Sequence, residues 1–187
     1  KFRELHPEYD GVKIVHAATA GYAGTQYEGF FRALYAVVSQ LTEKTQKNEK
    51  INIITGYLSP ADQRYLKDLL QEMELDYILL PDFSDSLDGR HEEFYSRLPQ
   101  QGTSLADIAE MAGARYTLEL THFVQPEMSP AEYLKQAYGV PYTRLDLPTG
   151  LRGMDALLQK LSELGGKYTT KLRRARSRYL DAMVDAH

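Results

Sequence analysis

The sequence predicts an α/β fold: a doubly wound, mostly parallel, Rossmann-like sheet of about five strands, with helices on both faces and an extra C-terminal helix. Two observations predict it. Short apolar runs of strand length alternate along the 187 residues with longer stretches whose apolar residues recur at helical spacing. Capping residues and glycines stand where these helical stretches begin and end. Strands that alternate with helices favour a parallel sheet covered on both faces.

Five apolar runs are the predicted strands. They are Val12–Ala17, Ile51–Thr55, Tyr77–Leu80, Tyr116–Leu120 and Tyr142–Leu147, the last more exposed than the others. In a parallel sheet, binding sites lie at the carboxyl ends of the strands. The segments that follow these strands are therefore the first places to look for function, at residues 19–25, 56–58, 81–90, 121–128 and 148–150.

The first three predicted helices are marked by an apolar stripe or by a cap. Apolar residues from Tyr27 to Leu41 recur at helical spacing. Ser59 is the expected N-cap of the next helix, with Pro60 at its first position. Ser104 begins a short helix that we expect to stop at Gly113.

Three more helices complete the pattern. Ser129 and Glu132 have the spacing of a capping box, in a helix that we expect to end at Gly139. An apolar stripe from Leu151 to Leu164 predicts the next helix, and the last runs from about Thr170 to the chain end. We expect a domain over residues 1–166 and a C-terminal helix, 167–187, that leads out of it.

Composition narrows the function classes. The chain has 22 Lys and Arg against 26 Asp and Glu, a net charge of −4, so we expect neither nucleic acid nor an anionic membrane as partner. We find no apolar run long enough to cross a membrane and no signal segment, and we expect a cytoplasmic protein. With no cysteine, the chain itself holds no disulfide, thiolate zinc site or cysteine-bound iron–sulfur cluster. It starts at Lys1 rather than Met, and we expect a fragment.

The first loop, Thr19–Thr25, contains Gly21 and Gly24 and precedes a helix. Glycines there could let a phosphate approach the helix N-terminus. The spacing is not G-x-G-x-x-G, and no P-loop lysine follows. We therefore favour a tight turn over a nucleotide site.

The loop Pro81–His91 holds three carboxylates, two hydroxyls and a histidine. It follows a strand, where binding residues often lie. Asp, Ser and Gly are also ordinary turn formers, and no calcium-loop pattern is present. A turn is the favoured interpretation and a binding role the alternative.

Asp181 and Asp185 lie four residues apart on the last predicted helix, so both carboxylates share one face. They could provide part of an oxygen site for a hard cation. The favoured interpretation from spacing alone is a solvated face neutralised by Arg178 or another arginine. The basic run from Lys167 to Arg178 is likewise expected to face solvent or a subunit.

His16, His122 and His187 are isolated in the sequence and are expected to be structural. No Gly-x-Ser-x-Gly, Cys/His or His-Glu-x-x-His pattern supports a hydrolase.

Four segments carry a resemblance to a known family. Residues 18–30, ATAGYAGTQYEGF, resemble the pattern T-P-x-[FY]-x-G-[ST]-x-x-x-G; residues 51–56, INIITG, resemble INIIPG; residues 150–158 resemble GLxxTDxFL; residues 178–187 resemble RGRLxDxMxDxH. In this order they resemble the nitrogenase component 1 family, on its beta-subunit side. The resemblance spans essentially the whole chain.

The resemblance implies that residues 1–166 are the second of three Rossmann-like domains and that 167–187 lead toward the third. The cysteines of the shared iron–sulfur cluster, of the 8Fe-7S type, would lie in the first domain, so no cofactor would be bound by this fragment. The family's beta chain can also offer a serine oxygen to that cluster, and Gly21 stands at the matching position. The loop Ser84–Gly89 looks more like the scaffold subunit that assembles the iron–molybdenum cofactor.

The implied function is that of a nitrogenase-type oxidoreductase beta subunit in nitrogen fixation, supporting electron transfer and packing with an alpha-type partner. The other implied partners are a second beta subunit and the iron protein reductase. Asp181 and Asp185 match residues that bind a lone metal ion between beta subunits, in the full assembly only. The isolated fragment is expected to be inactive. The alternatives are a beta-type cofactor-assembly scaffold and an unrelated small-molecule-binding α/β module.

Overall fold

The computed structural model describes residues 2–85, 102–121 and 123–185, without the side chains of 2, 3, 175, 178, 179, 181–183 and 185. A four-stranded sheet lies at its centre, in the order β2-β1-β3-β4. The strands are β1 Ile51–Thr55, β2 Tyr77–Leu80, β3 Tyr116–Leu120 and β4 Tyr142–Leu145. All neighbours pair in parallel, and Ile51 in β1 lies between Tyr77 of β2 and Tyr116 of β3. The predicted α/β class is confirmed.

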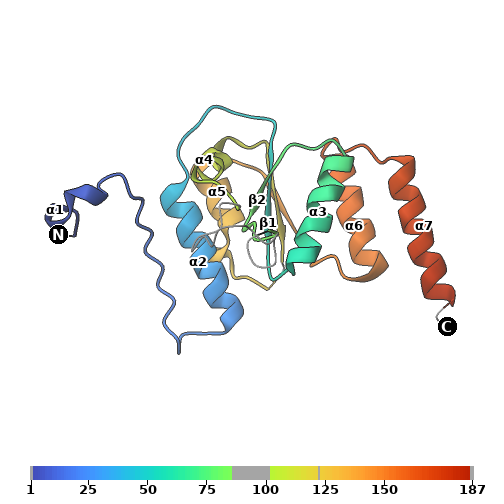
Figure 1. The fold of residues 1–187 in the computed structure, drawn as a ribbon, viewed down its shortest axis with the longest axis horizontal. Coiled ribbons are helices and arrows are strands. Elements are labelled where there is room, and N and C mark those ends of the chain that lie inside the picture. Colours follow the sequence, from blue (N-terminus) through green and yellow to red (C-terminus); the bar gives the residue numbers. More distant parts are fainter. Residues whose placement is uncertain (1, 86–101, 122, 186–187) are drawn as a thin grey trace, which may run out of the picture.

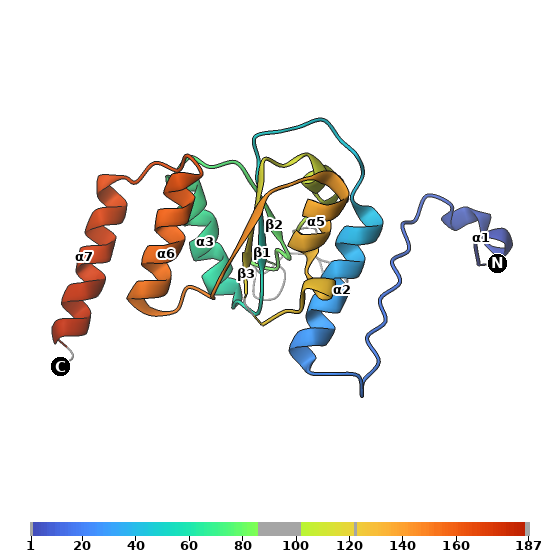
Figure 2. The same cartoon turned by 180° about the vertical axis from the view of Figure 1, so that it is seen from behind.

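Helices cover both faces of the sheet (Figure 1; Figure 2). One face carries α2 Gln26–Leu41, α4 Leu105–Glu110 and α5 Pro130–Tyr138, and the other carries α3 Pro60–Glu72 and α6 Gly150–Glu163. The last helix, α7 Thr170–Asp185, lies outside α6. Short elements complete the chain: α1 Phe2–Leu5, η1 Pro7–Tyr9, η2 Met111–Gly113 and η3 Pro126–Met128. In the part of the chain described, no helix is both long enough and apolar enough to cross a membrane.

The sheet separates two apolar clusters, because alternate residues of a strand point to opposite faces. Ile53 in β1 packs with α3 and α6, whereas Ile54, the next residue, packs with α2 and α5. Both side chains are fully buried. Burial on both faces explains why the central strands appear in the sequence as continuous apolar runs.

Several helix starts in the described part of the chain use the side chain of their N-cap residue. Ser59, Ser104 and Ser129, which we predicted, each accept a hydrogen bond from the backbone N–H three residues on, and Thr25 does the same for α2. The carboxylate of Glu132 does not complete the predicted capping box. It accepts hydrogen bonds from Gln136 and from the Tyr142 hydroxyl instead.

The first predicted strand is wrong. Residues 12–17 form no strand, and Val12 and Ile14 are 49% and 53% exposed. The segment runs beside α2, away from the sheet (Figure 1). The sheet therefore has four strands among the described residues rather than five, and β4 ends at Leu145 rather than Leu147.

Candidate functional site

The strand order defines where a ligand would be expected. From β1 the chain adds β2 on one side, and from β3 it adds β4 on the other side. The strand order therefore reverses between β1 and β3. Open parallel sheets bind ligands in the crevice outside the carboxyl ends of such strands. Here these ends lead into Gly56, after β1, and Thr121, after β3.

Tyr27, from the first turn of α2, occupies this position. Its hydroxyl donates a hydrogen bond to Thr121 Oγ1 at 2.6 Å. A Cβ atom at Gly56 would come within 2.9 Å of the same hydroxyl oxygen. Burial raises the pKa of Tyr27 above its ordinary value, so the hydroxyl remains a neutral donor. An aromatic side chain thus fills the place where nucleotide-binding sheets hold their ligand.

The first loop caps α2 with its own side chains. Thr25 Oγ1 accepts from the Glu28 N–H at 3.2 Å, and Glu28 Oε2 accepts from the Thr25 N–H at 2.6 Å. Gly24 has a φ of 110°, and a Cβ there would lie 2.3 Å from Glu28 Oε2. This arrangement supports a tight turn over a phosphate site. Sequence reasoning missed the capping box, although its T-x-x-E pattern at residues 25–28 was readable.

Gly21 is exposed, as are the other residues of this loop. A Cβ atom added there would meet nothing within 4 Å among the described residues. Packing within this domain therefore does not require glycine at the position matched to a family cluster ligand.

A shallow pocket of about 300 Å³ opens at the carboxyl ends of β3 and β4. It is lined by Tyr27, Thr121, Phe123, Asp146, Leu147 and Thr149. Phe123 is 80% exposed, and Tyr22 in the first loop is fully exposed. Two large aromatic side chains at the carboxyl edge are thus exposed.

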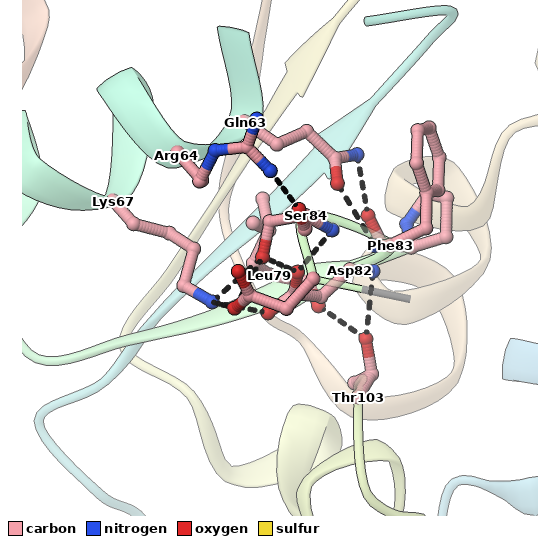
Figure 3. Close-up of polar contacts among 10 residues, drawn as sticks. Gln63, Arg64, Lys67, Leu79, Asp82, Phe83, Ser84 and Thr103 are labelled. Carbon is pink, nitrogen blue, oxygen red and sulfur yellow. Dashed lines mark hydrogen bonds and ion pairs between the residues drawn. The ribbon is translucent and has the colours of Figure 1, made fainter. Parts of the chain in front are cut away.

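A polar cluster, defined here as Lys67, Asp82 and Ser84, holds the chain after β2 (Figure 3). Lys67 Nζ of α3 donates to Asp82 Oδ2 and to Ser84 Oγ, both at 2.9 Å. The Ser84 hydroxyl donates to Asp82 Oδ1 at 2.6 Å, and the Ser84 N–H donates to the same oxygen at 3.0 Å. The cluster thus joins α3 to the loop through a charged pair and a buried hydroxyl.

Neighbouring side chains bind the backbone of the same loop. Gln63 donates to the Pro81 carbonyl and accepts from the Phe83 N–H, both at 2.9 Å. Arg64 donates to the Ser84 carbonyl, and the Thr103 hydroxyl accepts from the Asp82 N–H. Every one of these bonds positions the loop (Figure 3).

The electrostatics of the polar cluster favour a structural role. Burial acts to raise the pKa of Asp82, but hydrogen bonds from Ser84 and Lys67 outweigh it and leave the pKa below its ordinary value. For Lys67, burial acts to lower the pKa, and Asp82 outweighs it to give a raised pKa. Both groups stay charged, and Ser84 is only 1% exposed. Neither a free base nor an accessible nucleophile results.

The loop Pro81–His91, which offered either a turn or a binding site, is described only as far as Asp85. That part is a turn fixed to α3. Ser86, Asp88 and His91 lie outside the described residues, so a binding role for them stays a prediction.

A buried ion pair that the sequence did not predict joins β3 to β4. Glu119 is completely buried, and its carboxylate accepts from Arg144 Nε and from the Ser129 hydroxyl, each at 2.8 Å, and from the Ala131 N–H at 3.2 Å. Burial raises the pKa of Glu119, against these donor contacts. The only signal in the sequence was a charged residue inside an apolar strand, in YTLEL.

The last helix is attached to the domain by polar contacts. Arg176 donates from two nitrogens to the Asp155 carboxylate of α6, and Lys171 pairs with Glu72 of α3. The basic run is thus partly neutralised by acidic residues of the domain. A groove of about 370 Å³ lies beside these contacts, among α3, α6 and α7.

Asp181 and Asp185 both fall within α7, but their side chains lie outside the described part. The metal prediction for this pair stays a prediction. Among the described residues no group of three or more His, Cys, Asp or Glu has a metal-binding arrangement. The backbone N–H and carbonyl of His16 bind the Gln40 amide. His122 and His187 are not described.

Comparisons with known proteins agree on one family. The family model "Nitrogenase component 1 type Oxidoreductase" matches residues 1–187. The nitrogenase molybdenum-iron protein beta chain of Clostridium pasteurianum is 33% identical, over 95% of this chain and 39% of its own length. The nitrogenase iron-molybdenum cofactor biosynthesis protein NifN of Mesorhizobium japonicum is 31% identical, over 96% and 40%.

A solved structure gives the same result. The chain titled "Nitrogenase Cp1 at pH 6.5" superposes with a TM-score of 0.91 at 30% identity, covering 99% of this chain and 41% of that one. The present chain therefore spans about two fifths of the length of the relatives that it matches.

Proposed function

The chain belongs to the nitrogenase component 1 type oxidoreductase family, with beta-type relatives, and from this we propose that residues 1–166 are the middle domain of a beta-type subunit in a nitrogenase complex. In that complex it supports electron transfer by packing with an alpha-type partner. Residues 167–187 lead from it to a further domain. The working assembly contains a second beta subunit, receives electrons from an iron protein reductase and resides in the cytoplasm.

The observation that carries this proposal is that side chains of the domain itself fill the carboxyl edge of the sheet and bind its polar groups. Tyr27 fills the crevice between β1 and β3, and the polar groups of the loop after β2 are bound by residues of the same domain. The described part of the edge keeps exposed aromatic rings, at Tyr22 and Phe123, rather than a free polar constellation. Such an edge suits contact with another protein surface better than catalysis.

The cluster of the 8Fe-7S type that the family implies does not fit the residues of this chain. Iron–sulfur clusters are held by cysteine thiolates, and the chain has no cysteine. The ligands must come from outside residues 1–187, and residues 1–187 perform no step at the cluster. The fragment by itself is expected to be inactive.

The carboxylate pair of α7 remains a candidate inter-subunit ion site. Asp181 and Asp185 are spaced to share a helix face. Two carboxylates are an incomplete oxygen site, so the remaining ligands would come from a second beta subunit. Loss of a stoichiometric divalent ion from the full assembly on Asp181→Asn/Asp185→Asn exchange would support this site, and retention would refute it.

A second candidate function, a scaffold for assembly of the iron–molybdenum cofactor, is favoured by Gly21. This residue leaves the position of a family cluster ligand without a side chain, although an added Cβ atom would meet nothing within 4 Å among the described residues. Family membership excludes the third alternative, an α/β module unrelated to nitrogenase.

Activity of the full-length protein, co-expressed with its alpha-type partner, distinguishes the two candidates. Reductase-dependent acetylene reduction supports the catalytic beta chain. Transfer of cofactor to an apo-nitrogenase, without acetylene reduction, supports the scaffold. A complex that does neither contradicts both.

A further inference from the structure

The thioether of Met128 accepts a hydrogen bond from a guanidinium group. Met128 ends the short turn η3, directly before α5, and Arg32 lies on α2. Arg32 Nε donates to Met128 Sδ at 3.3 Å, between residues 96 positions apart in the chain. Thioether sulfur is only a weak acceptor. A permanently charged donor is thus held against a group that binds it weakly.

The only carboxylate of α2 is engaged elsewhere. Glu28, one turn before Arg32, accepts hydrogen bonds from the N–H and the hydroxyl of Thr25. The Arg32 Nε proton is directed to sulfur instead, although charged donors form their stronger hydrogen bonds with oxygen. An oxygen atom added to the sulfur would therefore improve the acceptor that Arg32 already faces.

The accessibility of Met128 distinguishes it from the methionines of the core. Four of the five methionines have described side chains. Met73 and Met111 are completely buried. Met128 and Met154 are half-buried and pack at the margins of the two core clusters. Of these four, Met128 alone has a hydrogen-bond donor on its sulfur among the described residues.

We propose that Met128 is a site of reversible oxidation by hydrogen peroxide, and that Arg32 binds the resulting sulfoxide oxygen. A sulfur lone pair of Met128 attacks one peroxide oxygen, so that the S–O bond forms as the O–O bond breaks. The departing hydroxide takes the proton of the transferred oxygen and leaves as water. Sulfur loses two electrons and the peroxide gains them. A methionine sulfoxide reductase reverses the step, and its two thiols become a disulfide while the oxygen leaves as water.

Arg32 makes this oxidation compatible with the fold. A sulfoxide is polar, and without a donor it disrupts the packing around it. At Met128 the sulfoxide oxygen accepts the Arg32 N–H in a charge-assisted hydrogen bond. The position is sensitive, because the next residue is Ser129, whose hydroxyl binds the buried Glu119 carboxylate. Arg32 thus keeps an oxidised η3 in place beside the buried ion pair.

Peroxide treatment of the full-length protein, read by site-resolved mass spectrometry and amide exchange, tests the site. Met128 should be oxidised at peroxide concentrations that leave Met73 and Met111 intact, and a methionine sulfoxide reductase should reverse the change. The Ser129 amide, which is hydrogen-bonded within η3, reports on the local structure. Oxidation should change its exchange rate by less than about threefold in the wild type and by at least about tenfold in Arg32→Met.

Two further variants are controls. Met128→Leu has no sulfur at this position and should show no peroxide-dependent change in the exchange of the Ser129 amide. Arg32→Lys keeps a cationic donor and should lie between the wild type and Arg32→Met. An unoxidised Met128 in the folded protein overturns the proposal, and so does an equal rise in exchange in the wild type and Arg32→Met. None of these measurements requires a cofactor, a partner subunit or activity, so their result is independent of the proposed function.

Discussion

Glu119 and Arg144 lie opposite each other in the register of β3 and β4 and form an ion pair with the carboxylate completely buried. This pair connects the edge strand to the centre of the sheet. The Ser129 hydroxyl and the Ala131 N–H also donate hydrogen bonds to the Glu119 carboxylate, which connects the start of α5 to the pair. One buried carboxylate thus joins two strands and a helix.

Removing Arg144 should cost far more than removing a surface cation. Arg144→Met leaves a buried carboxylate without its countercharge, which costs about 3–5 kcal/mol of unfolding free energy. Lys171→Met, which removes the exposed pair with Glu72, is the matched control and should have little effect. Equal losses in urea unfolding of the two variants would contradict the role given to the buried pair.

The double substitution Glu119→Gln/Arg144→Met removes the ion pair without leaving an unpaired buried carboxylate. It therefore distinguishes the loss of the pair from the cost of burying an unpaired charge. The neutral amide that replaces the carboxylate can still accept a hydrogen bond from the Ser129 hydroxyl, so much of the stability lost in Arg144→Met should return. Urea unfolding of the double variant beside Arg144→Met measures this recovery. No recovery would show that Arg144 acts through packing alone.

The Asp82 carboxylate should make stability depend on acid pH. Its folded pKa lies below the ordinary value, so its contribution is present above the unfolded carboxyl pKa of about 3.9 and is lost as the pH falls below it. The difference in unfolding free energy between wild type and Asp82→Asn should therefore shrink as the pH falls below about 3.9. A difference that stays constant would contradict the assignment. Asp76→Asn, at an exposed carboxylate without a side-chain partner among the described residues, is the control.

Tyr27→Phe tests whether the ring or its hydroxyl fills the switch-point crevice. The change removes the hydrogen bond to Thr121 and keeps the ring, so we expect a loss of about 0.5–1.5 kcal/mol in unfolding free energy. Tyr27→Ala removes the aromatic body as well and should cost several times more. Similar costs for the two variants would show that the ring contributes little.

The two glycines Gly21 and Gly113 should respond differently to an added side chain. A Cβ atom added at Gly21 would meet nothing within 4 Å among the described residues, whereas a Cβ at Gly113 would lie 2.2 Å from the Gln46 carbonyl oxygen. Gly113→Ala should thus cost about 1–3 kcal/mol of unfolding free energy, and Gly21→Ser should leave it nearly unchanged. Strong destabilisation by Gly21→Ser would show that the loop requires glycine.

Three of the four strands could be predicted from the sequence, because their burial on both faces makes them continuous apolar runs. Ile51–Thr55, Tyr77–Leu80 and Tyr116–Leu120 have the predicted bounds. Val12–Ala17 has the same kind of sequence, but a strand needs a paired edge, and local composition does not provide one. Its β-branched residues indicate a local preference for the extended conformation, but they do not show that a partner strand is present.

The contacts of the candidate site were harder to predict, because they join residues far apart in the chain. Lys67 meets Asp82 across α3 and β2, and Tyr27 meets Thr121 across 94 positions. Ser129 was predicted as a cap, but its second contact, with Glu119, depends on the register of β3 against α5. The spacing of residues within one helix or strand does not predict contacts between residues of different elements.

The iron content of the full-length protein, co-purified with its alpha-type partner, tests the assignment to a nitrogenase-type complex most directly. We expect a stable heteromeric complex that carries many iron atoms per heterodimer, although residues 1–187 supply no cysteine. A full-length protein that binds no iron and no alpha-type partner would contradict that assignment.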